Sequence, residues 1–73
     1  MKVQILGTMT EKDGTRWYSG ITGTGNVVEF TLLDDADPLF LVDIKRAVKH
    51  RHVIEVDVND IRQFRRLVKR GPT

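Results

Sequence analysis

The sequence predicts a small two-layer α+β domain with its elements in the order β-β-β-α-β-α. The chain has 73 residues, which suffices for a single domain spanning residues 1–73. Its first half alternates apolar and polar residues, as strands do, between glycine-containing turns. After residue 34 the apolar residues recur at helical spacing. A small, strongly bent barrel with the helices as a plug or arm is the alternative architecture.

Three strands are expected in the first half of the chain, over residues 2–10, 16–21 and 27–33. Asp13-Gly14 lies between the first two and is a typical hairpin turn, because both residues tolerate a positive φ. Residues 22–26 form the second turn. One face of the third strand is wholly apolar and consists of Val28, Phe30 and Leu32. Together these segments predict an antiparallel meander.

A helix is expected to start at Asp37-Pro38, with Asp37 as its N-cap and Pro38 as its first residue. Its core-facing residues would be Phe40, Leu41, Ile44, Ala47 and Val48. A fourth strand over residues 52–58 follows this helical crossover, so we expect it beside the first strand and parallel to it.

A second, amphipathic helix is predicted from Asp60 to about Arg70, capped by Asp57 or Asn59 and ended by Gly71. One of its faces would be apolar and formed by Ile61, Phe64, Leu67 and Val68. The opposite face would carry five cations, Arg62, Arg65, Arg66, Lys69 and Arg70.

Charge is distributed unevenly along the chain. Residues 1–43 contain three basic and seven acidic residues, a net charge of −4, whereas residues 44–73 contain nine basic and three acidic residues, a net charge of +6. A concentration of arginine and lysine on helical surfaces is typical of proteins that bind nucleic acid.

The leading hypothesis is therefore a small, non-catalytic accessory protein that binds DNA or RNA phosphates through a basic helical face. Its predicted contact residues are Lys45, Arg46, Lys49, Arg51, Arg62, Arg65, Arg66, Lys69 and Arg70. Solvation of the helices is the simpler interpretation of the same residues.

The alternative hypothesis is a protein-binding inhibitor or adaptor module of the kind that viruses and mobile elements encode. Its partner would meet the basic half, or an acidic patch formed by Asp34, Asp35, Asp37 and Asp43. Because opposite charges lie in the two halves, a homo-oligomer is also expected.

Trp17 and Tyr18 are adjacent in the expected second strand and therefore point to opposite faces. One of them should lie in the core, with Trp17 favoured. The other would be exposed or lie at a sheet edge beside Arg16, either without a role or able to stack on a base or anchor a protein contact.

The sequence offers little for catalysis or metal binding. It has no cysteine, and its single serine, Ser19, lies within an expected strand. His50 and His52 could bind a divalent metal together with Asp57 or Asp60, but a pair of surface histidines is the favoured interpretation. We therefore predict no enzyme activity, no metal and no cofactor. With neither a signal peptide nor a membrane-spanning segment expected, we predict a cytoplasmic protein.

Overall fold

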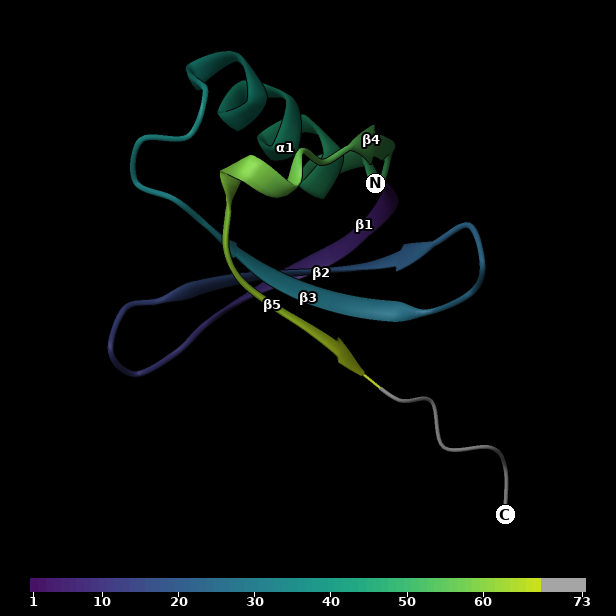
Figure 1. Ribbon diagram of the computed structural model, residues 1–73, viewed down its shortest axis with the longest axis horizontal. Coiled ribbons are helices and arrows are strands. Elements are labelled where there is room, and N and C mark those ends of the chain that lie inside the picture. The colour runs from purple at the N-terminus through teal and green to yellow at the C-terminus, as the bar shows by residue number, and fades with distance from the viewer. Residues whose placement is uncertain (68–73) are drawn as a thin grey trace.

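A five-stranded antiparallel sheet forms one layer of the protein, and one helix packs on it (Figure 1). The computed structural model describes residues 1–67. Its elements are β1 (Lys2–Thr10), β2 (Arg16–Thr22), β3 (Val27–Leu32), α1 (Pro38–His50), β4 (Val53–Glu55), a 3-10 turn (Val58–Asp60) and β5 (Ile61–Leu67). The strand order is β4-β1-β2-β3-β5. The predicted small α+β domain is thus confirmed, and its element order is confirmed in part.

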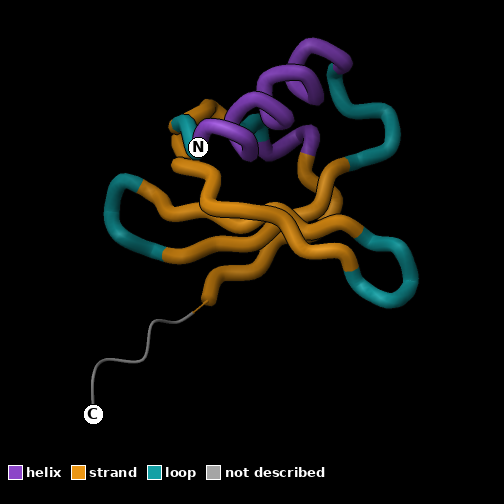
Figure 2. Tube along the Cα trace, turned by 180° about the vertical axis from the view of Figure 1, so that it is seen from behind, coloured by secondary structure: helices purple, strands orange, loops and turns teal. Residues whose placement is uncertain are grey.

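The first three strands form the predicted meander. Gly14 and Gly25 occupy the two turns with φ values of 90° and 84°, a conformation that glycine adopts without strain. In the first turn the Thr15 N–H donates to the Asp13 carboxylate over 2.9 Å, which lowers the pKa of Asp13 below its usual value. Figure 2 shows the two turns at opposite ends of the sheet, with the helix above it.

α1 begins where the sequence predicts. The Asp37 carboxylate accepts a hydrogen bond from the Leu39 N–H at 2.9 Å, and Pro38 is the first helical residue. The helix ends at Arg51, whose backbone is left-handed with a φ of 56° and whose N–H donates to the Ala47 carbonyl. Both ends of the helix are therefore capped.

Replacing Asp37 with alanine should lower the free energy of unfolding by about 1 kcal/mol, because the Leu39 N–H would lose its carboxylate partner. Urea denaturation followed by circular dichroism measures this loss. Asp35→Ala is the matched control, because Asp35 is exposed and caps no helix, and it should leave the midpoint unchanged.

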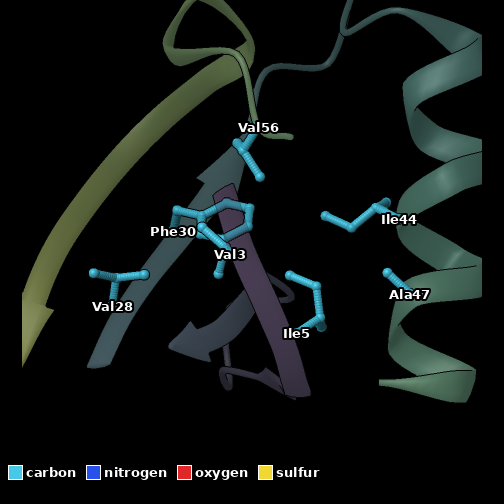
Figure 3. Close-up of a cluster of buried hydrophobic side chains, with 7 residues drawn as sticks. All are labelled: Val3, Ile5, Val28, Phe30, Ile44, Ala47 and Val56. Carbon is cyan, nitrogen blue, oxygen red and sulfur yellow. The ribbon is translucent and has the colours of Figure 1, made fainter. Parts of the chain in front are cut away.

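The core lies between α1 and the sheet (Figure 3). Strands β1 and β3 each contribute alternate side chains, and α1 contributes one stripe, as their sequence spacing predicts. The fully buried cluster consists of Val3, Ile5, Val28, Phe30, Ile44, Ala47 and Val56. Among the residues that pack around it are Tyr18, Leu32, Phe40, Val48 and Ile54.

β4 lies beside β1, as predicted, but runs antiparallel to it and spans only Val53–Glu55. The predicted parallel orientation is wrong. α1 crosses one end of the sheet from the β3 side to β4 and does not return along the strands (Figure 1). The next strand therefore enters the sheet from the end at which β3 left it. Val58, predicted to be in this strand, lies in the 3-10 turn and is 67% exposed.

The predicted second helix over residues 60–70 is wrong, because residues 61–67 form strand β5. Asp57 caps only a single 3-10 turn, accepting from the Asn59 N–H at 2.9 Å. The Leu33 N–H then donates to the Asp60 carbonyl, which brings the chain alongside β3. Pairing with β3 satisfies backbone groups along both strands, and this outweighs the helical spacing of the apolar residues.

Candidate nucleic-acid interface

The nine predicted contact residues do not form one surface. Four of them belong to α1 and the turn after it, Lys45, Arg46, Lys49 and Arg51. Three belong to β5, Arg62, Arg65 and Arg66. Lys69 and Arg70 lie outside the described residues. Since α1 packs on β1 and β4, and β5 is the opposite edge of the sheet, the two groups are separate sites.

The outer face of α1 gathers three cations. With 100° of rotation per residue, Lys45, Arg46 and Lys49 fall within a sector of about 100°. The centre of this sector is half a turn from the buried residues Ile44 and Ala47. All three side chains are therefore exposed on one surface. We call this surface, together with Arg51, the α1 basic face.

No carboxylate in the described part of the chain forms an ion pair with the α1 basic face, although Asp43 is exposed on the same helix. The two ion pairs found there join Glu55 to the terminal ammonium and Glu29 to Arg65, so they use none of its cations. The negative end of the helix dipole favours cations in the last turn, where Lys49 lies. The cations of this face are therefore available to a negatively charged ligand.

His50 and His52 flank Arg51, and their rings stack with centroids 5.2 Å apart. The Gln4 side-chain amide donates to the Arg51 carbonyl over 3.3 Å, which joins this turn to β1. Within residues 1–67, no three histidine and carboxylate side chains gather as a metal-binding group would require. Both imidazoles are exposed at the end of α1, beside Arg51.

Arg65 of β5 contacts side chains of both β2 and β3. On the sheet face away from α1, its Nε donates to Glu29 Oε1 over 2.7 Å, and its guanidinium lies 4.0 Å from the centre of the Trp17 ring. The Trp17 indole N–H also donates to the Glu11 carboxylate. This Trp17 cluster (Glu11, Trp17, Glu29 and Arg65) joins β2, β3 and β5. The Arg65 guanidinium is therefore already engaged by Glu29 and Trp17 within the sheet.

Arg62 and Arg66 are exposed on β5, beyond the part of the sheet that α1 covers. Arg66 is paired with Val28, and Phe64 with Phe30, so both lie on the core side of the sheet. Phe64 is 46% exposed. Arg62 and Phe64 also line one shallow groove, together with Met1, Val58 and Ile61. The sequence did not predict this groove, because the expected helix over residues 60–70 assigned Phe64 to the core.

Neither Trp17 nor Tyr18, the two adjacent aromatic residues of β2, is fully exposed. Trp17 is buried, as favoured by the sequence, but on the sheet face opposite the helix. Tyr18 is half-buried and stacks on Phe30 with ring centroids 5.7 Å apart. The expectation of an exposed aromatic beside Arg16 is therefore wrong, and no base-stacking role is assigned to either ring.

A wider hollow of about 530 Å³ lies on the other side of Arg62, between the first turn and the start of α1. Its lining combines both charges, with Arg16 and Arg62 on one hand and the exposed carboxylates Asp13 and Asp34 on the other. Such a mixed lining gives no net attraction for a phosphate.

The chain matches no known protein family, and no curated protein or solved structure is similar to it. Across residues 1–67, the helix present is neither long nor apolar enough to cross a bilayer. The functional argument therefore depends on the surfaces described above.

Proposed function

We propose that this protein is a non-catalytic nucleic-acid-binding protein that contacts phosphates through the α1 basic face. The observation that carries the proposal is the grouping of Lys45, Arg46 and Lys49 on one exposed helix surface without paired carboxylates. Arg51 extends this surface, and its left-handed backbone fixes the direction in which the chain leaves the helix.

Binding of this kind depends on charge and reads little sequence. Lysine and arginine side chains displace counterions from phosphates, whereas base recognition requires contacts in the grooves. Four phosphate contacts on duplex DNA should give a slope of about −3.6 when log affinity is plotted against log salt concentration. Affinity should therefore fall about 100-fold between 50 and 200 mM salt.

Non-catalytic action is part of the proposal. The hydroxyl of Ser19, the single serine, donates to the Gly7 carbonyl within the sheet and not to a histidine or carboxylate. The polar hollow beside Arg62 is open, and its carboxylates are solvated. Binding, rather than acid–base chemistry, is the activity that these side chains support.

The triple variant Lys45→Gln/Arg46→Gln/Lys49→Gln tests the proposal. Its salt slope should flatten to about −1, with binding weakened equally on unrelated sequences. Fluorescence anisotropy with labelled 20-base-pair duplexes and a single-stranded RNA gives the slopes. The fold should survive, because these side chains point away from the core.

Two control variants locate the contact surface. Arg62→Gln/Arg66→Gln removes two cations from β5 and should leave the slope unchanged. Asp34→Asn/Asp35→Asn should leave binding unchanged or strengthen it. The proposal is wrong if the wild-type protein retains no DNA or RNA at low salt, or if the β5 variant flattens the slope and the α1 variant does not.

A protein-binding module is the second candidate function. It is favoured by two exposed apolar side chains near β5, Val58 at 67% and Phe64 at 46% exposure, which a nucleic-acid interface does not require. A homo-oligomer stays a prediction, and sedimentation at low and high salt tests it.

A further inference from the structure

β5 is an edge strand whose outer side is unpaired within the described residues. It is hydrogen-bonded to β3 on one side and is the last strand in the order β4-β1-β2-β3-β5. An edge strand of seven residues directs about half of its backbone N–H and C=O groups outward, where they can pair with another strand. The other edge strand, β4, has only three residues and offers far less backbone.

The side chains of β5 specify what kind of strand would fit. Phe64 lies between Arg62 and Arg66, and the shallow groove with Val58 and Ile61 continues its apolar surface. β5 contains no acidic residue. In an antiparallel pair, directly opposite side chains contact each other, so a complementary strand would place carboxylates opposite the arginines and an apolar residue opposite Phe64.

A second copy of β5 does not meet this requirement in any register, because it has no carboxylate to place opposite an arginine. Two registers also bring like charges together. Two-fold antiparallel pairing centred on Phe64 would place Arg62 of each copy opposite Arg66 of the other. Centring on Arg65 would place the two Arg65 side chains opposite each other. Like charges in directly opposite positions are destabilising.

We propose that the free edge of β5 binds an extended, acidic segment of a partner protein by strand addition. The segment would carry an acidic and an apolar residue at alternate positions opposite Arg66 and Phe64, whose side chains lie on the core side of the sheet. A second acidic residue would follow near Arg62, where β5 departs from regular pairing with β3. Backbone hydrogen bonds would supply affinity, and the alternating side chains would supply specificity. This interaction is independent of nucleic-acid binding, because the α1 basic face lies toward the opposite edge of the sheet.

The test uses a synthetic peptide, acetyl-Thr-Glu-Thr-Ile-Thr-Glu-Thr-amide, added to the full-length protein labelled with ¹⁵N. Saturable chemical-shift changes should concentrate at the amides of β5 and the groove. A matched peptide with lysine in place of both glutamates should bind at least 10-fold more weakly. The variant Arg62→Glu/Arg66→Glu should reverse this preference, and Arg62→Gln/Arg66→Gln should abolish it, with each variant's spectrum reporting its fold.

N-methylated peptides separate strand addition from simple charge attraction. One peptide is methylated at the threonines and the other at the intervening residues, so both keep their charges. Only one of these two sets of N–H groups faces β5 in a paired strand, so one peptide should lose binding at least 10-fold and the other should retain it.

Three results would overturn the proposal. If both methylated peptides bind like the parent, or both fail to bind, no strand is added in a defined register. If the acidic peptide does not bind at millimolar concentration, the arginines only protect the edge from aggregation. If the free protein is a dimer that the peptide dissociates, a second copy occupies the edge. The salt-slope measurements on α1 are unaffected by any of these outcomes.

Discussion

Replacing Gly20 with alanine is expected to lower the free energy of unfolding by about 2–3 kcal/mol, because there is no space for a Cβ atom. Gly20 lies in β2 between Ile5 of β1 and Val28 of β3. A Cβ atom there would overlap the Val3 side chain and lie 2.7 Å from the Gln4 carbonyl oxygen. The backbone of β1 would have to move away, and its pairing with β2 would weaken.

The corresponding fall in melting temperature is about 10–20 °C for a domain of this size. Thermal denaturation followed by circular dichroism measures it. Gly23→Ala is the matched control, since a Cβ atom at Gly23 meets nothing within 4 Å, and its melting temperature should change little. Equal effects at Gly20 and Gly23 would contradict the packing described for the centre of the sheet.

Replacing Trp17 with alanine is expected to cost about 3 kcal/mol, although Trp17 lies outside the core beneath α1. Only 7% of its surface is exposed, and the Arg65 guanidinium covers its ring. The substitution would leave a cavity beneath the Arg65 guanidinium, on the sheet face away from α1, and would also remove the indole partner of Glu11. Because such a small domain has only a few kcal/mol of stability, much of the variant should be unfolded at 37 °C.

Trp17→Phe is the matched variant for this prediction. Phenylalanine keeps an aromatic ring under Arg65 and loses the indole N–H, so it should cost about 1 kcal/mol. Urea midpoints of the two variants give the comparison. A loss below 1 kcal/mol for Trp17→Ala would show that the Trp17 cluster does not hold β5 in place.

Local patterns were sufficient to predict the meander and α1. Asp13-Gly14 specifies a turn and Asp37-Pro38 a helix start through local backbone conformation, so both can be predicted without knowledge of the rest of the fold. The alternation of Val28 and Phe30 with polar residues likewise identified the buried side of β3.

β5 could not be predicted from its own residues. Ile61 and Phe64 are three apart, which fits one face of a helix, whereas a regular strand would place them on opposite faces. In β5 an irregularity at Arg62 places both on the core side, because Ile61 pairs with Leu32 and Phe64 with Phe30. What decides between the two is pairing with β3, together with the contact of Arg65 with Glu29, which is 36 residues away in sequence. Such tertiary contacts override local propensity without leaving a signal in a single sequence.

The candidate contact residues likewise fall into a group that the sequence could place and a group that it could not. Lys45, Arg46 and Lys49 lie on the exposed face of α1, as predicted, because they belong to a helix that the sequence specifies. Their contact with phosphates stays a prediction. Arg62 and Arg66 were assigned to a phosphate-binding helix face, whereas in the sheet they flank Phe64 at an open edge. Apolar and basic residues are interspersed along this segment, but the faces on which they lie depend on the pairing of β5 with β3.

The position of Trp17 determines what an optical measurement of this protein would detect. Trp17 is the single tryptophan, and its ring contacts Arg65 of β5 on the side of the sheet that α1 does not cover. Its fluorescence therefore reports the detachment of β5, whereas far-ultraviolet circular dichroism reports the melting of α1. If β5 opens before the rest of the sheet, the emission spectrum should shift at a lower urea concentration than the dichroism. Coincident transitions would instead identify both faces of the sheet as one cooperative unit.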